Sequence, residues 1–279
     1  MRARKVIAVG AAIPIALYLV VLVWVTLNQR ALTYQRDADN TPRVDPATAT
    51  VGMVKPREEM IDVPDGTRIV CWYLPAAPGK PTLLYFTGTG GAPARPHPFG
   101  LYDRAVAAGV GIFIMGYPGY GGSTGKPTEK SIMADADLAW NALIARGVPP
   151  SDIAIYGWSL GTGVAVQLAA RHPARALILE SPYSSMTELG SRNYPFLPIR
   201  QIISDSWDSM SFIGKVHAPL LILHGEIDTG VPIRFARKLF AAANQPKRFI
   251  DYHAGGHTDL YLFGAFEAVA AFAEHPSGE

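Results

Sequence analysis

Residues 152–163 have the sequence Asp-Ile-Ala-Ile-Tyr-Gly-Trp-Ser-Leu-Gly-Thr-Gly. A short apolar run leads into the pattern Gly157-x-Ser159-x-Gly161, and an alanine-rich stretch with helical spacing follows it. This order predicts a strand, a sharp turn and a helix, with the serine hydroxyl exposed at the turn. Both glycines are expected because a side chain at either position would collide with the neighbouring helix or strand. Ser159 is therefore the candidate nucleophile, beside the positive N-terminus of the following helix.

From about residue 58 onward the chain alternates between short apolar runs and longer stretches of helical spacing. This alternation predicts an α/β fold with a mostly parallel sheet and helices on both faces. It also disfavours the alternative that Ser159 is an incidental serine in a glycine-rich turn. The expected strands are Ile69–Leu74, Thr82–Phe86, Gly111–Met115, Asp152–Tyr156, Ala176–Leu179, Leu220–Leu223 and Arg248–Tyr252. The expected helices are Lys130–Arg146, Leu160–Arg171, Ile233–Ala243 and Leu260–Ala273.

Two segments depart from this alternation. Apolar residues near Met60–Val63 and at Arg68–Leu74 flank a Pro-Asp-Gly-Thr turn, which predicts an antiparallel hairpin at the edge of the sheet. Residues 183–217 are too long for an ordinary connection and contain scattered prolines and aromatic residues. They are predicted to form a small cap over the C-terminal ends of the strands, where open α/β sheets bind their ligands.

A serine nucleophile needs a base that takes its proton and an acid that orients the base. Asp228 follows the predicted strand Leu220–Leu223, and His257 follows the predicted strand Arg248–Tyr252. Serine, acid and histidine then occur in the chain order that is typical of this strand-turn-helix site. Asp228 and His257 are therefore the candidate acid and base.

Other residues could take these two roles. Glu226 precedes the candidate acid in the same loop, and Glu180 ends another predicted strand, so both are rival acids. His253 lies nearer its strand than His257 and is the rival base. The other candidates are expected in structural or surface positions: Asp259 as a cap of the last helix, His224 packed locally, and His97, His172, His217 and His275 at the surface.

The tetrahedral intermediate of acyl transfer needs backbone N–H donors aimed at its negative oxygen. One donor is expected from the amide of Leu160, directly after the nucleophile. The other is expected from the loop Thr-Gly-Thr-Gly-Gly at residues 87–91, with Thr89 as the donor. Residues 116–123, Gly-Tyr-Pro-Gly-Tyr-Gly-Gly-Ser, are expected to line the same cleft.

The first segment, residues 1–27, is predicted to be a membrane anchor. Val6–Leu27 carries no charge, and a helix of that length reaches roughly 33 Å, enough for a hydrocarbon core of about 30 Å. Arg2, Arg4 and Lys5 precede it, so the positive-inside bias places the N-terminus in the cytoplasm and the catalytic domain on the extracytoplasmic side. The alternative is a cleaved signal peptide, although the apolar region of such peptides is usually about 7–15 residues long.

Composition and boundaries complete the expected organisation. Residues 28–57 are predicted to be a polar linker, and residues 58–279 a single α/β domain that includes the cap at residues 183–217. The formal net charge of +2 gives no indication of a nucleic-acid partner. The single cysteine, Cys71, is expected to be a buried strand residue. No paired CxxC or HExxH spacing occurs in the sequence, so a dedicated zinc site is not expected.

Together these motifs resemble the membrane-associated α/β-hydrolases of the Bem46 and ABHD type and the related serine aminopeptidase-like hydrolases. The resemblance extends from about Met60 to Phe272 and implies the α/β-hydrolase fold, a triad of the matching Ser159, Asp228 and His257, and an N-terminal anchor. The motifs that carry it are Gly119-Tyr120-Gly121, Gly157 to Gly161, Ser181-Pro182-Tyr183-Ser184-Ser185-Met186, His224 to Pro232 and Gly255-Gly256-His257.

The chain departs from that family in two loops. Thr87-Gly88-Thr89 stands where the family usually has His-Gly-Asn, and Gly116-Tyr117-Pro118-Gly119 where it usually has Asp/Asn-Tyr-Arg-Gly. A backbone donor does not depend on side-chain identity, so the first departure is compatible with Thr89 as the oxyanion donor. The second is expected to alter the pocket or the bracing of its loop.

The expected activity is hydrolysis of a carboxylic ester or thioester through an acyl-enzyme, without a metal or organic cofactor. The expected substrate is a small-molecule or lipid-like acyl compound, and the expected partner of the N-terminal helix is a membrane. Two alternatives stay open. The same triad could serve a serine peptidase, or the chain could be a membrane-tethered binding protein on an inactive hydrolase fold.

Overall fold

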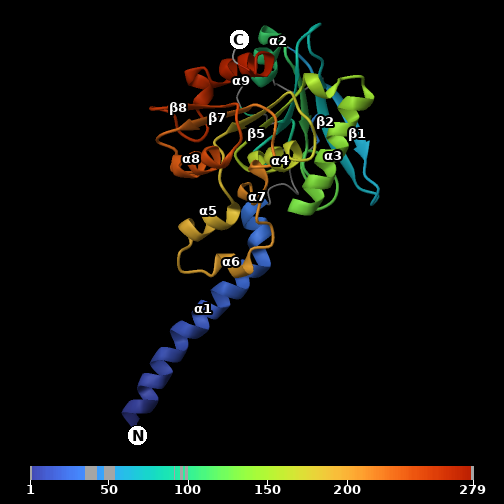
Figure 1. The fold of residues 1–279 in the computed structure, drawn as a ribbon. Helices are drawn as coiled ribbons and strands as arrows, with labels where there is room; N and C mark the ends of the chain where they lie inside the picture. The colour runs from blue at the N-terminus through green and yellow to red at the C-terminus, as the bar shows by residue number, and fades with distance from the viewer. Residues whose placement is uncertain are drawn as a thin grey trace.

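The computed structural model describes residues 2–34, 43–46, 54–90, 92–94, 97 and 100–277, with side chains from residue 13 onward. An eight-stranded sheet forms the centre of this part of the chain, in the order β1-β2-β4-β3-β5-β6-β7-β8 (Figure 1). The strands are β1 Arg57–Asp62, β2 Arg68–Leu74, β3 Thr82–Phe86, β4 Gly111–Met115, β5 Ile153–Trp158, β6 Ala176–Glu180, β7 Leu220–Gly225 and β8 Lys247–Tyr252.

The sheet is parallel from β4 to β8 and antiparallel at its first edge. β1 pairs with β2, and β2 pairs with β4, in the antiparallel sense, whereas the other neighbouring strands run parallel. The backbone N–H of Val63 bonds to the carbonyl of Thr67, and Gly66 has a φ of 85°, so the Pro-Asp-Gly-Thr turn closes the hairpin. The predicted edge hairpin and the predicted mostly parallel sheet are both confirmed.

Helices cover both faces of the sheet, and each face has its own apolar core. α3, α4 and α8 pack on one face, and α2 and α9 pack on the other. Central strands such as β3 and β4 are buried along their whole length, because both of their faces are covered. The helices are α1 Arg2–Tyr34, α2 Leu101–Ala108, α3 Glu129–Ala145, α4 Leu160–Ala169, α5 Met186–Asn193, α6 Ile199–Ile202, α7 Met210–Ile213, α8 Ile233–Ala242 and α9 Ala265–Glu274.

Two helical regions differ from the sequence prediction. The predicted helix Leu260–Ala273 is interrupted at Gly264, whose φ of 83° separates a short 3-10 turn, Leu260–Phe263, from α9. α2, Leu101–Ala108, was not predicted. The helix is capped at each end by a glycine in the left-handed conformation, Gly100 and Gly109. It buries the side chains of Leu101, Tyr102 and Ala105.

Helix α1 extends beyond the predicted anchor. It ends at Tyr34, not at Leu27, so residues 28–34 of the predicted polar linker are helical. At the other end of the predicted linker, β1 begins at Arg57. The linker's residues 35–42 and 47–53 lie outside the described residues. The α1 segment Ile13–Tyr34 is long and apolar enough to cross a membrane.

The 183–217 insertion contains α5, α6 and α7 and lies beside the C-terminal half of α1 (Figure 1). Arg192 at the end of α5 reaches the loop after β7, where its Nη1 lies 3.5 Å from the carbonyl oxygen of Thr229. The hydroxyl of Tyr18 in α1 bonds to the carbonyl of Phe196 at 3.0 Å. The insertion therefore bridges the N-terminal helix and a loop at the C-terminal end of the sheet.

Candidate active site

The turn that holds Ser159 has the strained geometry that its sequence predicted. Ser159 has φ 50° and ψ −118°, and α4 begins at the next residue. A Cβ atom on Gly157 would lie 2.5 Å from the carbonyl oxygen of Gly161, and one on Gly161 would lie 2.0 Å from that of Phe86. Real Cβ atoms do not approach so closely, so both positions require glycine. The turn aims the serine side chain away from β5 and toward the loops after β7 and β8.

Ser159, His257 and Asp228 form a continuous hydrogen-bonded chain. His257 Nε2 lies 2.9 Å from the Ser159 hydroxyl oxygen, and His257 Nδ1 lies 2.7 Å from Asp228 Oδ2. A carboxylate only accepts hydrogen bonds, so Nδ1 carries the proton and Nε2 presents its lone pair to the serine. The Asp228 side chain is fully buried, while that of His257 is partly exposed. This arrangement can remove a proton from the serine hydroxyl.

The loop that carries Asp228 is fixed by its own backbone. The second carboxylate oxygen of Asp228, Oδ1, accepts a hydrogen bond of 2.8 Å from the N–H of Val231. His224 Nε2 lies 2.7 Å from the carbonyl oxygen of Val231, so this imidazole donates to it. Burial lowers the pKa of His224, which keeps the ring neutral. His224 therefore packs locally, as predicted, and supports the turn behind the acid.

The loop that carries His257 is held by Asp259. Asp259 Oδ1 accepts a hydrogen bond of 2.6 Å from the N–H of Gly256, directly before the histidine. Its carboxylate makes no cap to the 3-10 turn that follows. The prediction that Asp259 caps the last helix is therefore wrong, because the carboxylate points back into the histidine loop.

The rival acids and the rival base lie in other pairs. His253 Nδ1 bonds to Glu226 Oε2 at 2.7 Å, and the His253 side chain is exposed. Glu180 is buried and binds the hydroxyl of Tyr156. Its other oxygen lies 3.2 Å from His97 Nε2. None of these pairs places a carboxylate on His257.

His97 has a different environment from the surface position expected for it. Its side chain is only 11% exposed, and its ring stacks on that of Trp158 with the centroids 3.9 Å apart. Trp158 precedes the nucleophile, and its indole Nε1 lies 3.3 Å from the carbonyl oxygen of His257. His97 and Trp158 thus support the serine and the histidine from one side. The contact joins distant parts of the chain, so no local sequence signal could have indicated it.

The loop after β3 lies directly against the nucleophile. A Cβ atom on Gly88 would lie 3.3 Å from the Ser159 Cβ and 2.7 Å from the Trp158 ring, so the backbone here passes close to the serine. The hydroxyl of Tyr117 donates a hydrogen bond of 2.6 Å to the carbonyl of Thr87 and braces this loop. The structure thereby places the loop that contains Thr89 next to Ser159, and Leu160 follows the serine directly.

Comparisons with known proteins identify the family to which the chain belongs. The family model for the alpha/beta hydrolase fold matches residues 81–201. The chain is 34% identical over 273 residues to an uncharacterized protein of Mycobacterium tuberculosis, which covers 94% of this chain and 90% of that protein. It is also 34% identical over 209 residues to human alpha/beta hydrolase domain-containing protein 17B, with 72% of this chain and 69% of that protein covered. The chain belongs to the α/β-hydrolase family.

The hydrolase also resembles solved structures with little sequence identity. An esterase from Pyrococcus furiosus matches it with a TM-score of 0.65 and 17% identity, over 83% of this chain and 97% of that one. At this identity the likeness concerns the fold. The resemblance to Bem46 and ABHD-type proteins is confirmed by the match to protein 17B.

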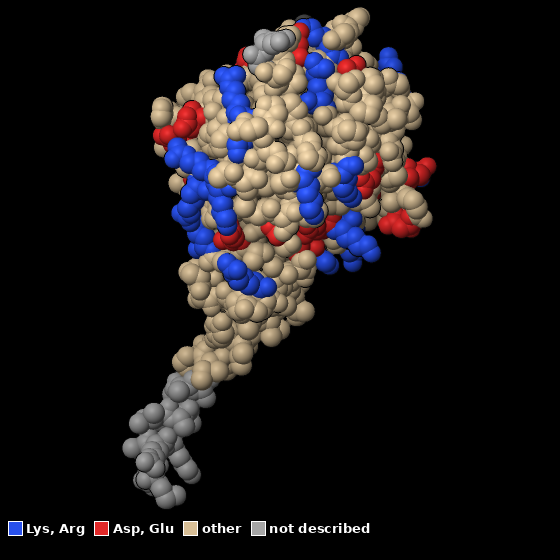
Figure 2. Space-filling model, viewed as in Figure 1, with Lys and Arg blue, Asp and Glu red and all other residues tan. Residues whose placement is uncertain are grey.

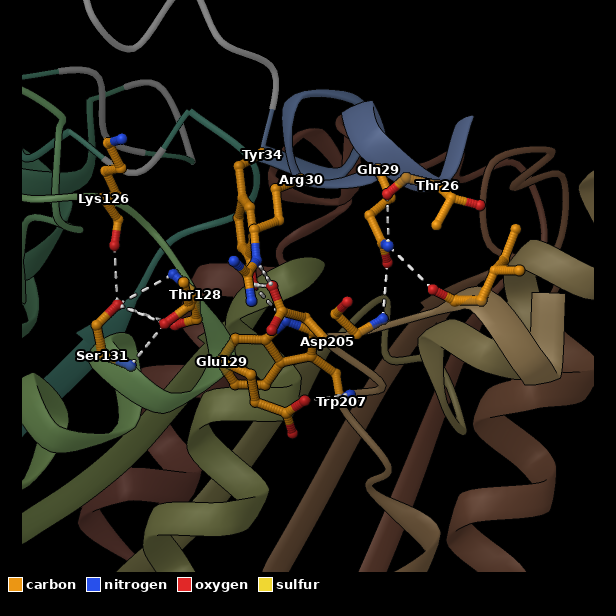
Figure 3. Close-up of polar contacts among 12 residues, drawn as sticks. Thr26, Gln29, Arg30, Tyr34, Lys126, Thr128, Glu129, Ser131, Asp205 and Trp207 are labelled. Atoms are coloured by element: carbon orange, nitrogen blue, oxygen red, sulfur yellow. Dashed lines mark hydrogen bonds and ion pairs between the residues drawn. The ribbon is translucent and has the colours of Figure 1, made fainter. Parts of the chain in front are cut away.

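The C-terminal end of α1 is tied to the 183–217 insertion and, through it, to the start of α3 (Figure 3). The hydroxyl of Tyr34 lies 3.1 Å from Asp205 Oδ2, and Trp207 Nε1 lies 3.1 Å from the same hydroxyl. The backbone N–H of Trp207 bonds to Glu129 Oε2 at 3.0 Å, and Gln167 in α4 bonds to Glu129 Oε1 at 2.7 Å. Tyr34 is 1% exposed, so the end of the N-terminal helix is part of the hydrolase core.

Within the described ranges, no group of three or more histidine, cysteine or acidic side chains could hold a metal ion. The thiol of Cys71 is buried in β2, and burial raises its pKa above the usual value. A buried thiol with a raised pKa is a poor nucleophile, so Cys71 is not a competing candidate to Ser159.

Proposed function

We propose that the protein is a membrane-anchored serine hydrolase that cleaves a carboxylic ester or thioester through an acyl-enzyme. The hydrogen-bonded chain from Ser159 through His257 to Asp228, with distances of 2.9 and 2.7 Å, carries this proposal. A base at 2.9 Å from the hydroxyl is within the range for direct proton transfer. The buried carboxylate orients the imidazole and stabilises its positive charge during the reaction.

The reaction proceeds in two steps. Ser159 attacks the carbonyl carbon while its proton passes to His257 Nε2, and the tetrahedral intermediate expels an alcohol or thiol that takes this proton. Water then attacks the acyl-serine, again with His257 as the base, and releases the carboxylic acid. The backbone N–H groups of Leu160 and Thr89 stabilise the negative oxygen of both intermediates. The positive end of α4 adds to this stabilisation because it begins at Leu160.

An acyl substrate is supported by the side chains on the two loops of the acid and the base. Ile227 stands beside Asp228 and is 61% exposed, and Leu262 and Phe263 follow His257 and are 67% and 44% exposed. Exposed apolar side chains of this size on the segments that carry the acid and the base suit the hydrocarbon part of an acyl chain. The solved structures similar to this chain include one described as an esterase and one described as a puromycin-hydrolysing peptidase.

The membrane anchor is proposed to be α1 itself, retained in the mature protein. The exposed residues of α1 between Ile13 and Val23 are almost all apolar. Its last residue, Tyr34, is buried in the domain, so the proposed membrane helix continues into the hydrolase without a flexible segment between them. The cluster Arg2, Arg4 and Lys5 places the N-terminus in the cytoplasm. The mass of the mature N-terminus, measured from native membranes, tests retention: a chain that starts near residue 30 would contradict it.

The decisive experiment is active-site labelling followed by a substrate panel. A fluorophosphonate probe should label the folded wild-type protein, and Ser159→Ala should abolish labelling while the protein stays folded. Wild-type protein that is folded and remains unlabelled would refute the proposal. A series of acyl esters and thioesters, compared with aminoacyl amides, then separates an esterase or thioesterase from a peptidase.

A further inference from the structure

The 183–217 insertion has an apolar tip, defined here as residues 194–199 with the sequence Tyr-Pro-Phe-Leu-Pro-Ile. Tyr194 is 49% exposed and Phe196 is 61% exposed, and their rings meet edge to face with centroids 6.4 Å apart. The lobe that contains the tip is mostly free of charged groups on the face that Figure 2 shows, whereas Lys and Arg gather over the sheet domain. Two large exposed rings on an uncharged loop are costly in water.

The tip is held against α1 by hydrogen bonds from polar side chains of that helix. The hydroxyl of Tyr18 donates to the carbonyl of Phe196 at 3.0 Å. Further along α1, Gln29 Nε2 donates to the carbonyl of Ile202 at 2.9 Å, and Gln29 Oε1 accepts from the N–H of Ser204 at 2.7 Å. These bonds place the tip and α6 alongside α1 between Tyr18 and Gln29. Figure 1 shows α6 beside α1.

The position of Tyr18 sets the depth of the tip. α1 has 33 residues, so it is about 50 Å long and exceeds a hydrocarbon core of about 30 Å. If Arg2, Arg4 and Lys5 lie at one boundary of the membrane, about 20 residues of α1 span its hydrocarbon core, which then ends at about residue 25. Trp24, which is 54% exposed, then lies at this second boundary, where indoles are enriched. Tyr18 and the carbonyl of Phe196 lie roughly 10 Å inside it.

The backbone of the tip suits a medium without water. Pro195 and Pro198 have no N–H group, the N–H of Leu197 bonds to the carbonyl of Tyr194, and the N–H of Ile199 bonds to that of Leu197. Tyr18 satisfies the Phe196 carbonyl from outside the loop. Irregular backbone at membrane depth is tolerated where protein satisfies its polar groups, and these bonds satisfy the N–H groups of Leu197 and Ile199 and the carbonyl of Phe196.

We propose that the apolar tip enters the membrane leaflet on the side of the catalytic domain and contacts lipid beside α1. This inference rests on the proposed anchoring of α1 in a membrane. Arg192 and Arg200 flank the tip and are exposed, so their guanidinium groups reach the lipid phosphates at the boundary. Because Arg192 also contacts Thr229, the tip holds the loop of Asp228 close to the bilayer surface. The substrate class that this placement favours is an acyl compound that resides in the membrane.

Lipid contact at single positions tests the proposal with the full-length chain in phosphatidylcholine vesicles. A cysteine is introduced at one exposed position at a time and labelled with an environment-sensitive fluorophore, and quenching by a lipid that carries a nitroxide on its acyl chain is measured. Phe196→Cys and Tyr194→Cys report on the tip. Val20→Cys, at a position 65% exposed in α1, reports on the anchor. Val106→Cys, 47% exposed on α2 far from α1, is the control. The buried Cys71 of the wild-type chain gives the background.

The expected result is quenching at Phe196→Cys and Tyr194→Cys similar to that at Val20→Cys, with none at Val106→Cys. Quenching at Val20→Cys together with unquenched tip positions would overturn the inference and leave the anchor in place. An unquenched Val20→Cys would refute the anchor and, with it, the insertion of the tip. Two tip positions are used so that a disturbance by one substitution cannot decide the outcome, and thermal unfolding confirms that each variant is folded.

Discussion

The indole Nε1 of Trp207 donates a hydrogen bond to the hydroxyl of Tyr34 across 3.1 Å, and both side chains are buried in the hydrolase core. Tyr34 is the last residue of α1, and Trp207 lies in the 183–217 insertion. The backbone carbonyl of Tyr34 also accepts a hydrogen bond from Tyr120, in the loop that braces the backbone beside the nucleophile. The helix end and the catalytic domain therefore fold as one unit.

Removal of the Tyr34 hydroxyl should destabilise the whole domain. Tyr34→Phe leaves the Trp207 indole N–H and one Asp205 oxygen without this partner, which should cost roughly 1–3 kcal/mol of unfolding free energy. Tyr34→Ala also opens a cavity and should cost about 3–5 kcal/mol. Thermal unfolding of the full-length protein in detergent measures both, with Tyr194→Phe as a control on an exposed ring. A Tyr34→Phe protein that unfolds at the wild-type temperature would show that the helix end is not part of the domain.

Asp135 in α3 should make the stability of the protein depend on pH. The residue is 3% exposed, and burial, with a smaller contribution from the charge of Asp65, raises its pKa from 3.8 to about 7. Between these two values the unfolded chain loses the proton and the folded chain keeps it, so stability falls as the pH rises from about 4 to about 7. Asp135→Asn removes the charge and should raise the unfolding free energy at pH 8 by about 1–3 kcal/mol, with little change at pH 4.

Unfolding by urea at pH 4, 6 and 8 gives the measurement. Asp137→Asn is the matched control on the same helix, because its carboxylate bonds to Arg171 at 2.8 Å and its loss should not stabilise the protein. Equal unfolding free energies of wild type and Asp135→Asn at pH 8 would contradict the raised pKa.

Asp228→Asn and Glu226→Gln should separate the acid of the proposed triad from its neighbour. An amide at position 228 would present either an N–H or a carbonyl to His257, and the loss of the carboxylate removes the charge that stabilises the imidazolium. We expect kcat for an activated ester to fall by roughly 10³- to 10⁴-fold in Asp228→Asn. Glu226→Gln should keep nearly wild-type kcat, because Glu226 binds the exposed His253. The opposite ranking of the two variants would assign the acid to Glu226.

Features with a local sequence signal could be predicted, and features made by distant contacts could not. Gly157 and Gly161 indicated the strained turn directly, because their side-chain positions are filled by the backbone of neighbouring elements. The apolar runs predicted the central strands, because strands that are buried on both faces are apolar along their whole length. Residues 28–34 are polar and showed no helical periodicity. Their helix is stabilised by distant contacts, since Arg30 and Tyr34 bond to Asp205, and Trp207 bonds to Tyr34. His97 was placed at the surface for the same reason: its partner Trp158 is distant in the chain.

Gly88→Ala should impair catalysis more than folding. An added Cβ would lie 2.7 Å from the Trp158 ring and 3.3 Å from the Ser159 Cβ, so the loop after β3 has to move away from the serine. The N–H of Thr89 would move with it, and loss of one oxyanion donor typically costs about 10²- to 10³-fold in kcat. We expect a fall in kcat of up to roughly 10²-fold, because the loop can partly adjust, with a smaller change in KM.

Gly214→Ala is the control for this substitution. A Cβ there would lie 4.0 Å from the carbonyl oxygen of Ala242, and the residue has a helical φ of −69°, so alanine fits without movement. Its kcat and unfolding temperature should match those of the wild type. If Gly88→Ala kept the wild-type kcat, the backbone at Thr89 could not be an oxyanion donor in its present position, and the second donor would have to come from another loop around Ser159.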